Sequence, residues 1–200
     1  MTPAQRHALE ALWPTFGLQL SDIVEADFLN DAALTVEIGF GMGDSLVEMA
    51  EADPARNFLG IEVHRPGVGH LLIEAEKKQI RNLKVLNEDS IEVLSALQAH
   101  SVDRLQVFFP DPWPKKKHHK RRLINRSFLD LAASVLHNGG CLHVATDWAP
   151  YAEEILMLLN DHGSFQVTTA PPRVETKYEK RGIRLGHEVF DIAYLANTDT

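Results

Sequence analysis

Short apolar runs alternate with stretches of helical period along most of the chain. Runs such as 34–40 and 58–63 have the length of buried strands and are bounded by turn residues. Between them, apolar residues recur every three to four positions, which is typical of amphipathic helices. The pattern predicts strands at 34–40, 58–63, 83–89, 104–109, 141–147, 165–169 and 188–196, and helices at 45–52, 66–80, 90–98, 125–140 and 150–163. Asp44 or Ser45 is the candidate N-cap of the helix at 45–52.

Five repeats of strand followed by helix indicate a doubly wound, mostly parallel α/β sheet. The last two strands have no long helix between them, so we expect them to form an antiparallel hairpin at one edge. We expect one Rossmann-like domain over 34–200, with residues 1–33 as an N-terminal extension packed on it. Such a sheet binds its ligands at the carboxyl ends of its strands, so the residues that follow each strand carry the functional information.

The composition is that of an ordinary globular protein, with 44% hydrophobic and 24% charged residues in a chain of 200. The single cysteine, Cys141, can form no internal disulfide, which favours a reducing compartment. The start of the chain has no signal-peptide pattern, and no apolar run approaches 18 residues. We therefore expect a cytoplasmic protein without a membrane partner.

Charge is distributed unevenly. The net charge is −8, yet residues 115–126 read KKKHHKRRLINR and contain seven basic residues and no acid. Because salt screens charges beyond roughly 8–10 Å, this local patch matters more than the total charge. It predicts a surface for nucleic-acid phosphates, although a solvated loop remains the alternative.

A glycine-rich turn follows the first strand. Gly39, Gly41 and Gly43 have the spacing G-x-G-x-G, which lets a backbone turn tightly and approach a ligand closely. The dinucleotide fingerprint requires a glycine where this chain has Asp44. Glu37 precedes the turn, and its charge disfavours a pyrophosphate and suits a cation such as S-adenosylmethionine. A nicotinamide dehydrogenase is therefore disfavoured, and a turn that binds no ligand is the other alternative.

Acidic residues also end the next two strands. Glu62 lies 23 residues after Gly39, where a carboxylate can accept hydrogen bonds from both ribose hydroxyls of an adenosine. Asp89 ends the third strand, where it can accept from the adenine amino group or cap the following helix. These two roles of Asp89 are compatible, and both remain open.

The fourth strand leads into Pro110-Asp111-Pro112-Trp113-Pro114. Three prolines stiffen this loop, which lowers the entropy cost of holding a carboxylate and an indole in place. An aromatic face and a hydrogen-bond acceptor are what an extruded base requires, and the loop runs directly into the basic stretch. Asp147 and Trp148 repeat the acid and indole after the fifth strand. The ten histidines show no zinc-ligand spacing, so we expect no metal.

The segments VEIGFGMG, GIEVH, FPDPWPKKKHHKRR, ATDW and TKYEKRG together resemble the bacterial tRNA (guanine-N7)-methyltransferase family. This resemblance, over roughly residues 8–195, implies a class I methyltransferase fold with a seven-stranded sheet and S-adenosylmethionine as cofactor. It implies tRNA as the partner and 7-methylguanosine at position 46 of the variable loop as the product. Pro114 departs from the histidine that is more usual there.

The resemblance also implies roles for individual residues. Glu37, Glu62, Asp89 and Asp111 would line the cofactor pocket, and Asp111 would be the catalytic acid. The residues that would contact tRNA are Lys115, Lys117, His118, His119, Lys120, Arg121, Arg122, Asp147, Thr176, Lys177, Tyr178 and Glu179.

Guanine N7 carries a lone pair and no proton, so its methylation requires positioning and no general base. We expect Asp111 to orient the guanine and to offset the positive charge that develops on its ring. An adenine-amino methyltransferase is the enzymatic alternative, because its D-P-P-[YFW] loop resembles PDPW. A non-catalytic RNA-binding module is the other alternative, and the choice between monomer and homodimer stays open.

Overall fold

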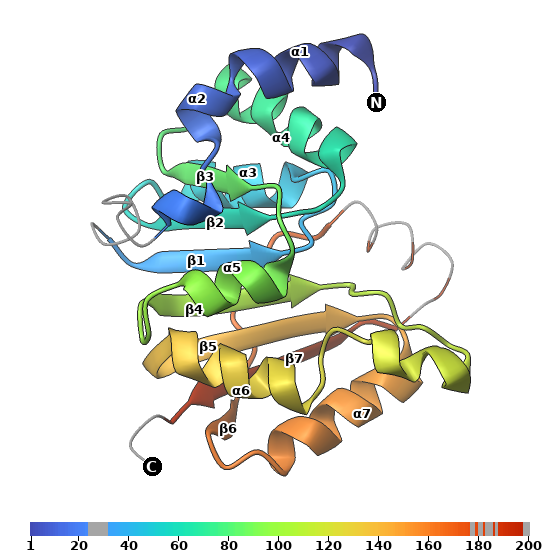
Figure 1. Cartoon of the computed structure of the whole chain (residues 1–200). Coiled ribbons are helices and arrows are strands. Elements are labelled where there is room, and N and C mark those ends of the chain that lie inside the picture. Colours follow the sequence, from blue (N-terminus) through green and yellow to red (C-terminus); the bar gives the residue numbers. More distant parts are fainter. Residues whose placement is uncertain (24–31, 177–178, 180–181, 183–185, 187, 198–200) are drawn as a thin grey trace.

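The computed structural model describes residues 1–200 except 24–31, 177–178, 180–181, 183–185, 187 and 198–200. In this part of the chain, seven strands form one sheet in the order β3-β2-β1-β4-β5-β7-β6 (Figure 1). The strands are β1 Leu34–Ile38, β2 Asn57–Ile61, β3 Leu83–Leu86, β4 Val102–Phe108, β5 Leu136–Thr146, β6 Phe165–Thr168 and β7 Phe190–Ala196.

The first five strands are parallel, and β7 pairs antiparallel with both β5 and β6. This confirms the predicted doubly wound sheet with an antiparallel edge. The chain moves outward from β1 to β3 and then returns to place β4 on the other side of β1. The carboxyl ends of β1 and β4 therefore flank the point at which sheets of this kind bind ligands.

Helices cover both faces of the sheet. They are α1 Pro3–Ala11, α2 Trp13–Phe16, α3 Asp44–Ala52, α4 Arg65–Lys77, α5 Ser90–Ala96, α6 Arg126–Val135 and α7 Ala149–Asn160. One apolar cluster joins α1, α3 and α4 to strand residues such as Phe58 and Val85. A second cluster joins α5, α6 and α7 to Leu59 and Val107. Neighbouring strand residues such as Phe58 and Leu59 enter different clusters because successive side chains point to opposite faces.

The N-terminal segment lies against α4 and the outer edge of β3 (Figure 1). At Gly69 of α4, a Cβ would come within 2.6 Å of the Gln5 carbonyl oxygen, so α1 packs closely here. Leu18 N–H donates to the Val85 carbonyl at 2.9 Å, which pairs the segment with the free edge of β3. The division into an extension and a core stays a prediction.

Two details of the predicted elements are wrong. The helix predicted over 125–140 ends at Val135, and Gly139 and Gly140 lie inside β5 instead of stopping the helix. Gly139 adopts a φ of 81°, and the β4–β5 register shifts nearby, so these glycines serve an irregularity in the strand. Helix α3 is capped by Gly43 in the left-handed conformation, not by Asp44 or Ser45, which both lie within the helix.

Candidate functional site

A cavity of about 320 Å³ opens at the carboxyl ends of β1 and β4. Its walls are the glycine turn, the start of α3, the end of β4 and one residue of a distant segment. The lining residues are Glu37, Gly39, Phe40, Gly41, Met42, Gly43, Asp44, Ser45, Phe108, Phe109 and Thr176. The structure thus brings Glu37, the three predicted glycines and Thr176 around one cavity, which we call the donor pocket.

The glycine turn is held by close packing and by one carboxylate. Gly43 has a φ of 79°, and a Cβ there would lie 2.5 Å from the Leu71 side chain, so glycine is required twice over. At Gly67 of α4, a Cβ would lie only 1.9 Å from the Gly41 carbonyl oxygen. Glu62 Oε2 accepts from the Gly41 N–H and its Oε1 from the His64 N–H, both at 2.8 Å. Glu62 therefore fixes the turn, and its predicted ribose contact stays a prediction.

Glu37 is the buried acid of the donor pocket. Only 2% of its surface is exposed, and within the described residues its Oε2 atom has no hydrogen-bond partner. Burial raises the pKa of Glu37 to about 8, although the Arg173 charge acts to lower it and Glu62 acts to raise it. An unpaired buried carboxyl in a pocket fits a cationic ligand, which would supply the missing partner and favour the ionised form.

Asp89 caps the helix that follows β3. Its side chain accepts from the Ile91 N–H at 2.8 Å at the start of α5. Of its two open roles, the structure therefore shows the helix cap. Neither Asp89 nor Asp111 lines the donor pocket, so their predicted cofactor contacts stay predictions.

The loop after β4, residues 109–114, is strained and externally anchored. Phe109 and Trp113 have φ values of 52° and 42°, a region that non-glycine residues adopt at a cost. The prolines lack N–H groups, so the loop has few donors of its own. Arg122 supplies one, because its Nε donates to the Pro112 carbonyl at 2.9 Å.

Arg122 is 3% exposed, which does not fit the prediction that it contacts RNA. Its guanidinium forms an ion pair with Glu154 of α7 and lies over the Tyr151 ring at 4.7 Å. Burial raises the pKa of Tyr151 to about 12, and its hydroxyl accepts from the Ile124 N–H. Arg122 thus faces the protein interior and anchors the loop 109–114.

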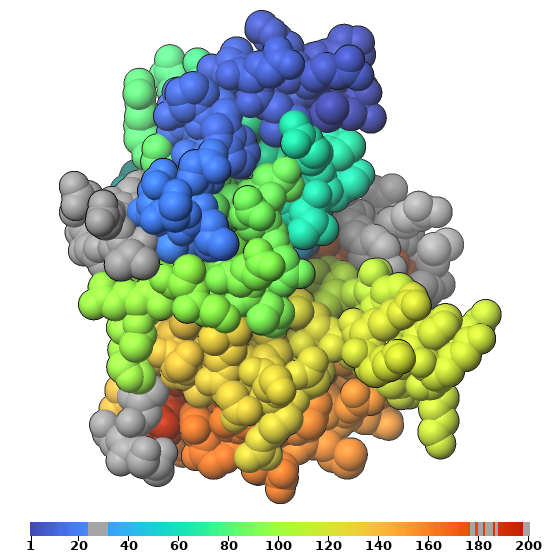
Figure 2. All heavy atoms as spheres, in the orientation of Figure 1, coloured from blue at the N-terminus to red at the C-terminus, as the bar shows by residue number. Residues whose placement is uncertain are grey.

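The rest of the basic stretch lies outside the core. Residues Lys116–Arg121 form a 3-10 helix that projects from the body in yellow-green at the right of Figure 2. Lys115, Lys117, Lys120 and Arg121 are exposed, whereas His118 and His119 are partly buried. Arg121 lies over the Trp113 ring at 4.9 Å and His118 meets it edge-on at 5.8 Å. The stretch therefore remains a candidate surface for phosphates and is joined to the loop through Trp113.

Asp147 directly follows β5, at the sheet edge where the loop after β4 also begins. Trp148 is the N-cap residue of α7 and is 39% exposed. The predicted tRNA contact of Asp147 stays a prediction.

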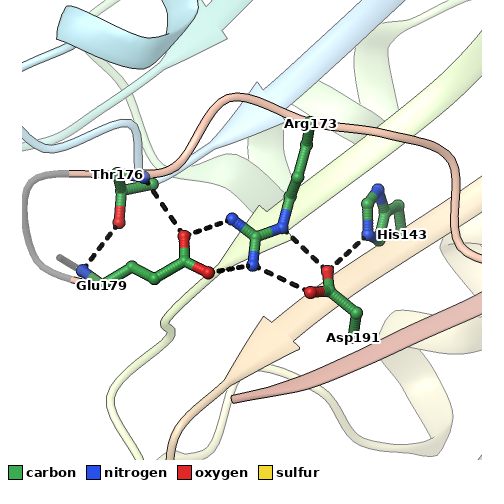
Figure 3. A network of polar contacts seen from close by, with 5 residues as sticks. All are labelled: His143, Arg173, Thr176, Glu179 and Asp191. Carbon is green, nitrogen blue, oxygen red and sulfur yellow. Dashed lines mark hydrogen bonds and ion pairs between the residues drawn. The ribbon is translucent and has the colours of Figure 1, made fainter. Parts of the chain in front are cut away.

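The TKYE segment turns inward at its last residue. Thr176 N–H donates to Glu179 Oε2 at 3.2 Å, and Glu179 N–H donates to Thr176 Oγ1 at 3.1 Å (Figure 3). Glu179 is buried and forms an ion pair with the Arg173 guanidinium, so its carboxylate faces the protein rather than an RNA. Lys177 and Tyr178 lie outside the described residues.

The buried side chains of Arg173 and His143 meet the partly exposed Asp191 in a network that the sequence pattern does not reveal (Figure 3). Arg173 stands in a polar stretch of mixed charge, and Asp191 and His143 interrupt apolar strands singly. Nothing in the local pattern pairs them, because the three residues meet only when β5 and β7 align.

In the part of the chain that the structure describes, no three histidine, cysteine or acidic residues gather as a metal site. The same described residues contain no helix long and apolar enough to cross a membrane.

Comparison with known proteins identifies the family. A family model described as "Putative methyltransferase" matches residues 31–192. A tRNA (guanine-N(7)-)-methyltransferase of Halorhodospira halophila is 48% identical over 213 residues, covering 100% of this chain and 92% of the relative. This chain belongs to the tRNA (guanine-N(7)-)-methyltransferase family. A member from Nitrosococcus oceani is 47% identical and covers 100% of this chain and 88% of its own.

Solved structures extend the likeness of this tRNA (guanine-N(7)-)-methyltransferase family member to the fold. A 16S rRNA (adenine(1408)-N(1))-methyltransferase of Catenulisporales acidiphilia, with 17% identity, superposes with a TM-score of 0.62, covering 91% of this chain and 93% of the other. An rRNA methylase of Streptococcus thermophilus, with 12% identity, gives 0.59 and covers 86% and 93%. The class I methyltransferase fold predicted from the sequence is therefore confirmed.

Proposed function

We propose that this protein transfers the methyl group of S-adenosylmethionine to N7 of a guanine in tRNA, at position 46 of the variable loop. Full-length identity of 47–48% to tRNA (guanine-N(7)-)-methyltransferases supports this reaction. The observation that carries it in the structure is the unpaired Glu37 carboxyl beside the glycine turn, at the switch point of the sheet.

The residues of the donor pocket fit this cofactor. S-adenosylmethionine, when bound, supplies an activated methyl group on a positively charged sulfur. Glu37 gives the pocket an acceptor for a cation, and the open glycine turn lets the backbone approach the ligand. Glu62 keeps that turn in place through Gly41.

The chemistry at guanine N7 is positioning. The N7 lone pair needs no base to free it, so the protein must hold the purine in line with the methyl group at about 3–3.5 Å. We assign this to the strained, proline-stiffened loop 109–114, in which Asp111 orients the base and offsets its developing charge. The exposed Lys115, Lys117, Lys120 and Arg121 would hold the phosphates.

Incubation of the protein with bulk tRNA and methyl-labelled S-adenosylmethionine, followed by nucleoside analysis, tests the proposal. We expect labelled 7-methylguanosine, and none from a tRNA whose position 46 is not guanine. Labelled N6-methyladenosine would instead identify an adenine-amino methyltransferase. Retained tRNA binding without any methyl transfer would identify a non-catalytic RNA-binding module.

A further inference from the structure

Arg173 is the buried centre of an ion-pair network that reaches the surface at Asp191 (Figure 3). Its side chain is 6% exposed and donates two hydrogen bonds to the Glu179 carboxylate, at 2.5 and 2.8 Å. It donates two further hydrogen bonds to the Asp191 carboxylate of β7, at 2.8 and 2.9 Å. The planar fork of a guanidinium can serve two carboxylates at once, which an ammonium cannot do in this geometry.

The same guanidinium lies at the wall of the donor pocket. It lies 5.1 Å from the centre of the Phe108 ring and 5.7 Å from that of Phe109, and both rings line the pocket. Its charge also acts on Glu37 inside the pocket, where it lowers the pKa of that carboxyl against the larger effect of burial. Arg173 therefore contacts two phenylalanines of the pocket as well as Glu179 and Asp191.

Arg173 and Asp191 keep their charges around neutral pH. Burial acts to lower the pKa of Arg173, but the hydrogen bonds to Glu179 and Asp191 outweigh it and raise the pKa. Burial acts to raise the pKa of Asp191, but hydrogen bonds from His143 and Arg173 outweigh it and hold the pKa well below its usual range. The ion pair between Arg173 and Asp191 is therefore present around neutral pH.

Beside this satisfied network lies a row of unsatisfied polar groups. Glu37, Gln106 and His143 occupy paired register positions on β1, β4 and β5, so their side chains share one face of the sheet. Among the described residues, the buried side-chain atoms without a partner are Glu37 Oε2, both amide atoms of Gln106 and His143 Nδ1. A buried polar atom without a partner costs free energy, which distinguishes these three side chains from the paired Arg173 and Glu179.

We propose that Arg173 is a positioning residue that couples the donor pocket, through Glu179, to Thr176, a residue predicted to contact tRNA, so that methyl donor and tRNA bind more tightly together than separately. Thr176 lines the pocket and is hydrogen-bonded to Glu179, and Glu179 is fixed by Arg173. A ligand in the pocket thus contacts a wall whose position Arg173 sets. Linkage requires that tRNA raise donor affinity by the same factor. The proposal rests on the proposed function.

The test is a binding cycle that needs no turnover. The dissociation constant for tRNA is measured with and without saturating S-adenosylhomocysteine, the unreactive demethylated product. We expect the wild-type protein to bind tRNA at least about fivefold more tightly when the product is present. Product affinity, measured with and without tRNA by calorimetry, should change by the same factor.

Arg173→Lys keeps the positive charge near Glu37 but cannot hold both carboxylates. We expect the coupling factor to fall below about twofold, with product affinity in the absence of tRNA changed much less. Arg81→Lys is the matched control, because Arg81 is an exposed arginine just before the amino end of β3, whereas the pocket lies at the carboxyl ends of the strands, and it should keep the full factor. If Arg173→Lys fails to fold, Glu179→Gln removes the same ion pair and should abolish the coupling alike.

The two proposals fail in different ways. Absence of 7-methylguanosine with wild-type protein would overturn the proposed function. Normal methylation with equal tRNA affinity in the presence and absence of S-adenosylhomocysteine would overturn the coupling alone. Full coupling in a folded Arg173→Lys or Glu179→Gln protein would also overturn it, because the factor would then not pass through this network.

Discussion

The two halves of the site are held in place by different means. At the donor half, after β1 and β2, the glycine turn is fixed by its own backbone geometry, by the packing of α4 and by Glu62. At the half that we propose to bind RNA, which we call the RNA half, the loop after β4 is held by one buried arginine, and Thr176 and Glu179 are held by another. Arg122 pairs with Glu154 and lies over Tyr151, and Arg173 pairs with two acids and lies over two phenylalanines.

The donor half is rigid because of its backbone geometry, whereas the RNA half is rigid because buried arginine side chains hold it. The donor half needs particular φ angles and an absent Cβ, so it should tolerate few changes of residue size. The RNA half depends on two guanidinium forks that each satisfy several acceptors, so it should be sensitive even to the exchange of arginine for lysine. Substitutions on either side should therefore change different measured quantities.

Asp111→Ala should have the largest effect. The loop and its basic neighbours remain, so we expect kcat to fall at least about 100-fold because the developing charge loses its preorganised partner. Donor affinity should fall only modestly, as measured by calorimetry with S-adenosylhomocysteine. A steep pH dependence of the rate near neutrality that Asp111→Asn abolishes would contradict this assignment and indicate proton transfer.

Neutralising the projecting 3-10 helix should affect only RNA binding. We expect a log–log salt slope for tRNA of roughly −3 to −5, and replacement of Lys116, Lys117, Lys120 and Arg121 by alanine should flatten it by about 3, because each lost phosphate contact removes roughly 0.7–0.9. The tRNA affinity is measured by filter binding at salt concentrations from about 50 to 300 mM, over which a slope of this size changes the affinity by orders of magnitude. An unchanged slope would mean that this helix faces away from the RNA.

Gly67→Ala should damage the donor half selectively. The added Cβ would lie 1.9 Å from the Gly41 carbonyl oxygen, so the glycine turn must move. We expect the affinity for S-adenosylhomocysteine to fall about tenfold, or about 1.4 kcal/mol. The tRNA affinity measured without S-adenosylhomocysteine should stay within about twofold of the wild-type value. Gly163→Ala is the matched control, since a Cβ added there would meet no other part of the described chain within 4 Å. Equal losses in the two variants would show that the effect is not local.

Arg122→Lys should slow turnover by roughly tenfold without changing the salt slope, because the loop loses its anchor but the RNA loses no contact. Lys120→Ala should do the opposite and flatten the slope by about 0.7–0.9 with kcat nearly unchanged. Steady-state kinetics with salt titration measures both. A flatter salt slope of tRNA binding in the Arg122→Lys protein would show that Arg122 does contact the RNA.

The smallest effect concerns the pH dependence of stability. The folded protein holds a proton on Glu37 up to a pKa of about 8, whereas the unfolded chain releases it near the ordinary value of 4.5. Stability contributed by this group is therefore present at low pH and is lost as pH rises between these values. Glu37→Gln should remove that decline, seen as a Tm that falls by a few degrees less between pH 5 and 8. An unchanged pH profile would show that Glu37 is ionised in the free protein.

Most of the fold follows from patterns that are local in the chain. Apolar runs and helical periods predict the seven strands of the described sheet and the five helices that follow β1 to β5, because each element buries its own apolar face. They predict no helix in residues 1–33, where the structure has α1 and α2. The errors lie at glycines: Gly139 and Gly140 look like a helix stop but belong to an irregular strand, and Gly43 caps α3 where a polar residue was expected. A glycine permits several backbone conformations, and only the surrounding chain selects one.

The sequence by itself determined the doubly wound sheet, the glycine turn with Glu37, and the projecting basic stretch, since each is a property of neighbouring residues. Only the tertiary structure decided that Arg122 turns inward while Arg121 stays outside, and that Arg173 joins Glu179 to Asp191. The physical reason is that a charged side chain is buried only where partners satisfy it. Those partners come from helices, strands and loops that are separated in the chain and become neighbours when the sheet assembles.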